Sequence, residues 1–83
     1  MYKIIFGGPA DRFFRKLDKS NQVRLGKKIL ELELNPFLGK SLAGNFIGLR
    51  SLRVGEYRIV YQIKSNDCVI LVLKIGHRKN IYG

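Results

Sequence analysis

The segment comprising residues 49–61 constrains the fold more than any other part of the chain. Its β-branched and aromatic residues flank Gly55, a pattern typical of two strands joined by a tight turn. Successive side chains of a strand point to opposite faces, so pairing the apolar sides of both strands places Arg53 beside Arg58. An unpaired guanidinium is seldom buried, so this face must be partly open to water. The expected buried side of the second strand carries Tyr57, Ile59, Tyr61 and Ile63.

The remaining elements follow from hydrophobic spacing. Pro9 suits the first turn of a helix, and apolar residues recur at helical spacing from Ala10 to Leu17. Ser20 is the expected N-cap of a second helix, which runs to about residue 35 because Pro36 disfavours helical dihedrals in the residue before it. The expected strands cover residues 2–6, about 47–54, 57–64 and about 68–75.

This order of elements predicts the fold class. One strand, two helices and three strands make a single α+β domain over residues 1–83. The helical hairpin would cover one face of a mainly antiparallel, four-stranded sheet. The last strand is apolar on both faces, so it is expected in the interior of the sheet. The other face of the sheet stays open, and it is the face assigned to Arg53 and Arg58.

A large positive charge limits the partners of this chain. Its 83 residues include 16 Lys and Arg but only 6 Asp and Glu, which gives a formal net charge of +10. Such a charge predicts a polyanionic partner, either a nucleic acid or an acidic protein. The basic residues are spread over helices and strands, which disfavours membrane binding, and no signal peptide or membrane span is evident. The single cysteine, Cys68, lies in an apolar run and is expected to be buried, which favours a reducing cytoplasm.

The candidate chemistry comes from the arginines and the C-terminal segment. The sequence has no GxxxxGK[ST], CxxC or HExxH motif, and its acidic residues are scattered, so no metal ion or cofactor is predicted. Residues 76–83 carry the only histidine, His77, together with Arg78 and Tyr82. With Arg53 and Arg58 they supply the parts of a metal-free phosphodiester cleavage, namely cations for the phosphorane and His77 or Tyr82 for proton transfer. In RNA the nucleophile can be the 2′-hydroxyl of the substrate itself, so the protein need not supply one.

Two motifs carry a resemblance to a known family. These are LRVGEYRIVY at residues 52–61 and GHRKNIY at residues 76–82, and together they resemble the hallmark pair of the RelE/ParE toxin superfamily. The resemblance extends over the whole chain, including the helical hairpin. It implies the toxin of a type II toxin–antitoxin pair. The RelE branch cleaves messenger RNA in the ribosomal A site without a metal ion, whereas the ParE branch shares the fold and poisons DNA gyrase.

The resemblance also implies roles for individual residues. Arg58 falls on the transition-state arginine of the family and Arg78 on a second active-site arginine. Tyr82 resembles the C-terminal tyrosine that stacks on the base or assists proton transfer, and His77 resembles a histidine used as general acid or base. The best-known RelE members carry two lysines on the strand before the transition-state arginine, where this chain has Leu49 and Ser51. The general base is therefore left open between His77 and Glu56.

The remaining basic residues are candidate contacts to RNA, and the acidic partner is expected to be a cognate antitoxin that covers the arginines. Several of these cations lie on one face of the second helix and would dock on ribosomal RNA or form a plain solvated surface. A basic RNA-binding module without catalytic activity is a third possibility beside the nuclease and the gyrase poison. The candidate RNA-binding residues are Arg50, Arg24, Lys27, Lys28, Lys74 and Lys79.

Overall fold

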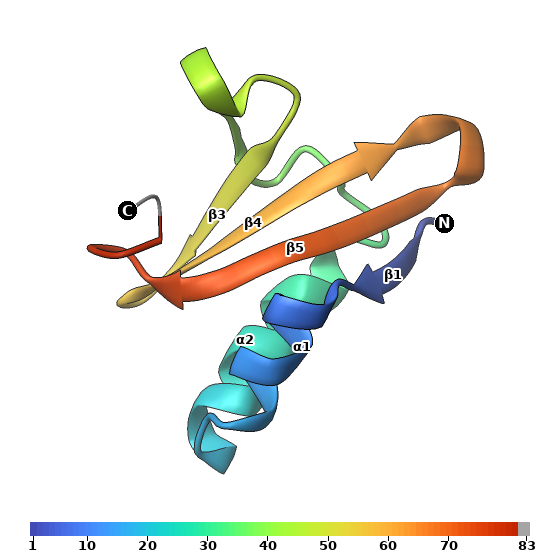
Figure 1. The fold of residues 1–83 in the computed structure, drawn as a ribbon. Coiled ribbons are helices and arrows are strands. Elements are labelled where there is room, and N and C mark those ends of the chain that lie inside the picture. The colour runs from blue at the N-terminus through green and yellow to red at the C-terminus, as the bar shows by residue number, and fades with distance from the viewer. Residues whose placement is uncertain (82–83) are drawn as a thin grey trace.

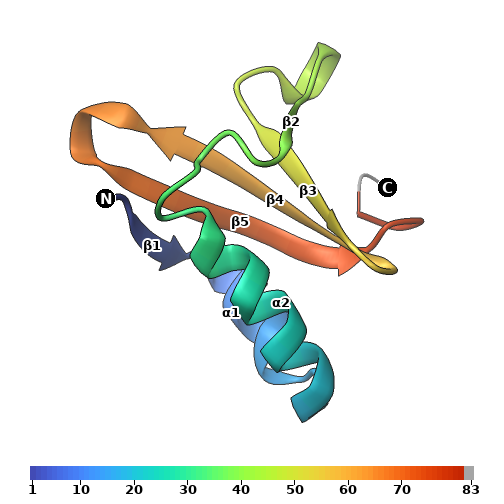
Figure 2. The ribbon, with the colours of Figure 1, turned by 180° about the vertical axis from the view of Figure 1, so that it is seen from behind.

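The computed structural model describes residues 1–81 and shows two helices packed on one side of a sheet (Figures 1 and 2). The α+β class is as predicted. The helices are α1 (Gly8–Arg15) and α2 (Lys19–Glu31). The strands are β1 (Lys3–Phe6), β2 (Lys40–Ser41), β3 (Arg50–Val54), β4 (Tyr57–Lys64) and β5 (Val69–His77). Two short 3₁₀ turns, Gly44–Phe46 and Ser65–Asp67, lie between strands. Neither α1 nor α2 is long and apolar enough to cross a membrane.

The sheet has five strands rather than the expected four, in the order β1-β5-β4-β3-β2. The additional strand is β2, which pairs with β3 through only two residues, Lys40 and Ser41, inside a stretch predicted to be a loop. Strand β1 runs parallel to β5, and the other pairings are antiparallel. Strand β5 therefore lies in the interior of the sheet, which confirms the prediction made from its apolar faces.

The register of the β3–β4 hairpin also confirms the sequence prediction. Arg53 lies directly opposite Arg58, and Val54 lies opposite Tyr57. The turn contains Gly55 with φ +61, a left-handed conformation that glycine adopts without a steric penalty. The two arginines therefore share one face of the sheet because the apolar residues on either side of them share the other.

Both ends of α2 differ from the prediction. The N-cap is Asp18 rather than Ser20, and the helix ends at Glu31 rather than near Asn35. Beyond the helix, the N–H groups of both Leu34 and Asn35 donate to the carbonyl of Glu31, at 3.3 and 3.0 Å. The α-helix therefore ends one helical turn before the position at which Pro36 alone would end it.

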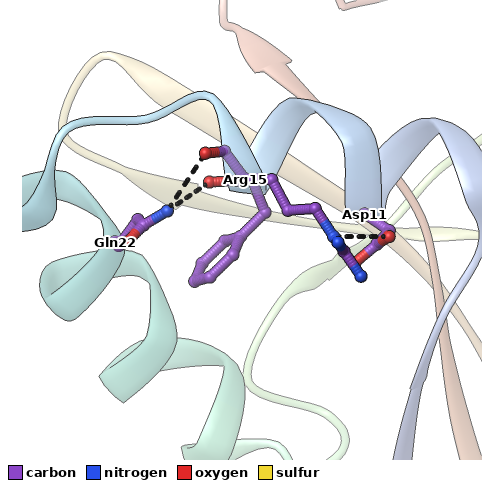
Figure 3. Close-up of polar contacts among 4 residues, drawn as sticks. Asp11, Arg15 and Gln22 are labelled. Carbon is purple, nitrogen blue, oxygen red and sulfur yellow. Dashed lines mark hydrogen bonds and ion pairs between the residues drawn. The ribbon is translucent and has the colours of Figure 1, made fainter.

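The two helices are joined by a polar contact at their connection (Figure 3). The Gln22 side chain of α2 donates to the carbonyl of Phe14 at 2.9 Å and more weakly to that of Arg15 at 3.4 Å. These carbonyls belong to the last turn of α1, where the N–H groups of a following helical turn are missing, and the Phe14 carbonyl also accepts from the Leu17 N–H at 3.2 Å. Arg15 also forms an ion pair with Asp11 at 3.0 Å. Gly26 lies inside α2, and a Cβ there would meet the Phe14 ring at 3.9 Å, an ordinary van der Waals distance, so the packing of the two helices does not require glycine at this position.

The core lies between the helices and the sheet. Ala10, Leu25 and Ile29 from the helices contact the apolar side of the sheet, and Tyr61 is fully buried among them. The prediction that Cys68 is buried is wrong. Cys68 is exposed and left-handed, with φ 53, because it ends the turn before β5 rather than starting that strand. The buried sheet residues of this core are Leu52, Val54, Ile59, Tyr61, Ile70, Val72 and Ile75.

A bulge in β5 decides which residues of that strand face the core. Val60 lies opposite Lys74, whereas the next residue, Tyr61, lies opposite Val72, so Leu73 has no direct partner on β4. Val72 and Ile75 are three residues apart, and they both reach the core because of this extra residue. Beyond the bulge, the alternation of side chains is the reverse of what an unbroken strand would give.

Candidate functional site

The face of the sheet opposite the helices carries two rows of residues defined by the strand register. Residues paired across strands point to the same face, and the neighbours of the core residues point away from the helices. The first row contains Lys40, Ser51, Val60 and Lys74, and the second contains Arg53, Arg58 and Gly76. This face carries four cations, and three of them, Lys40, Arg53 and Arg58, line one cavity together with Ser51.

Arg53 and Arg58 border a cavity of about 260 Å³ on this face. Arg58 is half-buried, and its Nη1 donates to the Ser51 hydroxyl at 3.5 Å. Arg53 is exposed, and its Nε donates to the Gly55 carbonyl at 3.4 Å. Within residues 1–81 neither guanidinium has a carboxylate at ion-pair distance. The cavity therefore presents cations that no carboxylate of residues 1–81 neutralises, and it fits an anionic group.

Lys40 also lines this cavity, and it is not among the residues predicted for the site. It lies directly opposite Ser51, so it belongs to the same face as the arginines. The backbone just before it is held from both sides: the Gly39 N–H donates to the buried Tyr61 hydroxyl at 2.9 Å, and the Gly39 carbonyl accepts from Arg50 Nη2 at 2.7 Å. A two-residue polar strand has no hydrophobic alternation, so no sequence pattern marks it.

Arg50 was predicted to contact RNA, and in the structure its guanidinium makes contacts within the protein. It lies in register with the core residue Tyr61 and so on the opposite face from Arg58. Its guanidinium stacks over the Phe37 ring at 5.1 Å and hydrogen-bonds to the Gly39 carbonyl, and its buried Nε has no hydrogen-bond partner among residues 1–81. Its observed contacts therefore hold the loop before β2, and a contact to RNA stays a prediction.

The bulge in β5 separates His77 from the arginine pair. His77 lies opposite Tyr57, with ring centroids 4.9 Å apart, and its ring is 6.5 Å from that of Phe13 on α1. It therefore lies on the helix side of the sheet, at an exposed strand end. Glu56, the other candidate base, lines a second cavity of about 240 Å³ together with His77, Arg78 and Lys79.

The segment after β5 turns back over the face that carries Arg58. The Arg78 N–H donates to the Glu56 carbonyl at 2.9 Å, which ties this segment to the β3–β4 turn. Ile81 is 2% exposed, and a Cβ at Gly76 would come within 3.1 Å of its Cδ1. Because Gly76 lies opposite Arg58, Ile81 covers the sheet next to that arginine. Tyr82 lies outside the described residues.

The predicted basic face of α2 lines a third cavity, of about 550 Å³, between that helix and the β3–β4 turn. Arg24, Lys27 and Lys28 belong to it, and Arg53 borders both this cavity and the one next to Arg58. Lys28 forms an ion pair with Glu31 at 3.5 Å, and among the described residues Glu31 is the acidic residue that lines this cavity. Within residues 1–81 no three His, Cys, Asp or Glu side chains are grouped as metal ligands.

In comparisons with known proteins, this chain is similar to toxins of toxin–antitoxin systems. A family model described as the ParE toxin of the type II toxin–antitoxin system parDE matches residues 4–82. Toxin RelG of Mycobacterium tuberculosis is 36% identical over 45 residues, which are 54% of this chain and 52%, or about half, of that relative. The structure of the toxin–antitoxin complex RelBE2 from Mycobacterium tuberculosis has 28% identity and a TM-score of 0.85, covering 93% of this chain and 98% of the other. The isolated RelE toxin of E. coli has 25% identity and a TM-score of 0.81, covering 93% and 84%.

Proposed function

This chain belongs to the ParE toxin family of type II toxin–antitoxin systems, and from this premise we propose that it is a ribosome-dependent endoribonuclease that cleaves messenger RNA without a metal ion. The observation that supports this function is the pair Arg53 and Arg58, which lie opposite each other next to a cavity and without carboxylate partners in residues 1–81. Cleavage of RNA in the cytoplasm would block translation.

The proposed reaction uses a nucleophile that belongs to the substrate. The RNA 2′-oxygen attacks the adjacent phosphorus while a base removes its proton, and the bond to the 5′-oxygen breaks as that oxygen gains a proton. The products are a 2′,3′-cyclic phosphate and a 5′-hydroxyl end. The phosphorane carries more negative charge than the substrate, so fixed guanidinium groups stabilise it more than they stabilise bound RNA. Arg58 and Arg53 are assigned this role.

The remaining roles follow the resemblance and are part of the same proposal. Arg78 would contact the RNA next to the scissile bond, and Tyr82 would stack on a base or transfer a proton. His77 or Glu56 would act as the base, although both line the cavity next to Arg78 rather than the one next to Arg58. An RNA strand that contacts both the base and Arg58 would have to cross the end of the sheet between these two cavities.

Primer extension on a translated message tests this function. Wild-type protein should cut within codons, and the Arg58→Ala and Arg78→Ala variants should lose about 100-fold or more of the cleavage rate. Arg12→Ala is the matched control, because Arg12 is an exposed arginine on α1, away from the arginine pair. Messages left intact by wild-type protein on active ribosomes would refute the nuclease.

The ParE-like alternative is a protein that binds and poisons DNA gyrase without cleaving RNA. It is favoured by the family model itself, which is the ParE toxin and covers residues 4–82. Intact messages together with gyrase arrested on DNA would support this alternative. A supercoiling assay with purified gyrase, run beside the primer extension, separates the two functions.

We further propose that a cognate acidic antitoxin binds this chain and inhibits it. The net charge is +10, and the ion pairs of residues 1–81, Asp11–Arg15 and Lys28–Glu31, both lie within single helices. An acidic segment would neutralise the cavity lined by Arg24, Lys27, Lys28 and Arg53 and cover the arginines. Addition of the antitoxin should raise the melting temperature and abolish cleavage. A partner that leaves cleavage unchanged would count against this assignment.

A further inference from the structure

We propose that Lys40 is a third cation of the arginine cavity and binds a phosphate of the RNA backbone. This inference rests on the proposed function, because it takes the occupant of that cavity to be RNA. Lys40 lines the cavity together with Arg53 and Arg58. The site would then take a single-stranded RNA phosphodiester, which a planar guanidinium pair and a mobile ammonium group can contact from different sides.

The strand register fixes the position of Lys40 relative to the arginines. Lys40 lies directly opposite Ser51, and Arg53 follows two residues later on the same strand and face. Residues in that diagonal relationship have backbones about 7–8 Å apart, within reach of long side chains. The Ser51 hydroxyl between them accepts a hydrogen bond from Arg58. Lys40 therefore closes the side of the cavity that the β3–β4 hairpin leaves open.

Buried groups hold the backbone that carries Lys40. The Tyr61 hydroxyl accepts from the Gly39 N–H and donates to the Pro36 carbonyl at 2.7 Å, and both hydrogen bonds are buried. A Cβ at Gly39 would lie 2.7 Å from the Ser51 carbonyl oxygen, so the strand lies as close to β3 as a backbone can. Arg50 binds the Gly39 carbonyl from the other side. A short polar strand with this anchorage fixes the backbone position from which the Lys40 side chain extends before any ligand binds.

Among the described residues, no acidic group competes with a ligand for the charge of Lys40. Within residues 1–81 its ammonium group has no carboxylate at ion-pair distance, and its side chain is exposed. An ammonium group acts on phosphate as a strongly hydrated point charge, which suits a contact to a non-bridging oxygen. Its contribution should grow as the phosphorane gains charge, so Lys40 is assigned both to RNA binding and to the transition state.

Binding of an uncleavable RNA tests Lys40 separately from catalysis. The probe is a fluorescent 2′-O-methyl RNA hexanucleotide, followed by anisotropy with purified protein at several salt concentrations. Lys40→Ala should weaken binding by about tenfold, the usual effect of losing one charge-assisted contact. It should also lower the slope of log affinity against log salt by about 0.7, as expected for one phosphate contact on a single strand. Lys40→Arg should restore most of the affinity.

The matched control is Lys3→Ala. Lys3 is an exposed lysine on β1, at the opposite edge of the sheet from β2, and its removal changes the net charge equally. Melting curves of each variant establish that it is folded. Equal affinities of Lys40→Ala and Lys3→Ala, or no binding of the probe by wild-type protein, would overturn the inference. If Lys40→Ala weakens binding but wild-type protein leaves messages intact on ribosomes, the nuclease fails while the phosphate site stands.

Discussion

Replacing Tyr61 by phenylalanine tests how the cavity next to Arg58 is held together. The Tyr61 hydroxyl is fully buried and joins the Gly39 N–H at 2.9 Å to the Pro36 carbonyl at 2.7 Å. Tyr61→Phe keeps the ring but leaves both backbone groups buried without a partner. Each buried group left unsatisfied costs about 1–3 kcal/mol, so we expect the loss of both partners to lower the free energy of unfolding by about 2–6 kcal/mol. The free energy of unfolding of a typical domain is about 5–15 kcal/mol in total, so this loss would be a large part of it.

Urea unfolding followed by circular dichroism measures this loss. The midpoint should fall while the slope stays constant, because the surface exposed on unfolding is unchanged. In thermal melts, each kcal/mol of this loss lowers the melting temperature by about 4–8 °C for a domain of this size. Tyr57→Phe is the control, because the Tyr57 hydroxyl has no hydrogen bond within residues 1–81, and it should change stability by about 0.5 kcal/mol or less. A loss no larger than in this control would refute the assignment of Tyr61 as the anchor of the β2 segment.

Three further changes test other parts of the structure. Gly39→Ala should destabilise the protein by about 2 kcal/mol in urea titrations, because a Cβ at this position would lie 2.7 Å from the Ser51 carbonyl oxygen. An unchanged unfolding midpoint would contradict the close approach of β2 to β3. Ile81→Ala should lower the unfolding free energy by about 2 kcal/mol, since Ile81 is 2% exposed; a neutral effect would mean that this residue does not pack on Gly76. Cys68 is exposed, so its thiol should react with a disulfide reagent in native protein as fast as in unfolded protein, whereas strong protection would restore the prediction that it is buried.

The sequence was sufficient to predict the β3–β4 hairpin and its consequence. Apolar alternation on both sides of Gly55 determines the register, because a slip by one residue would move the core residues to the solvent face. The opposition of Arg53 and Arg58 follows directly from that register. The helical stripe of α2 was equally well determined, since Leu25 and Ile29 are both buried.

The rest of the site depends on two features without a local sequence signal. Strand β2 is two polar residues long and is held by tertiary contacts from Tyr61 and Arg50, so neither its existence nor the place of Lys40 could be predicted. The bulge at Leu73 reverses the alternation of β5 and directs His77 to the helix side. An unbroken alternation from Val72 would have placed His77 on the same face as Arg58.

The energetics of the open face give a physical reason for an anionic ligand there. Like charges directly opposite in an antiparallel pair destabilise a sheet, and Arg53 and Arg58 form such a pair without a carboxylate partner in residues 1–81. The fold adds Lys40 to the same cavity and holds its backbone with buried hydrogen bonds. When no ligand is bound, the repulsion between these fixed cations destabilises the folded state. The same arrangement becomes favourable when a phosphate or a carboxylate-rich segment is bound, because each cation then gains an opposite charge.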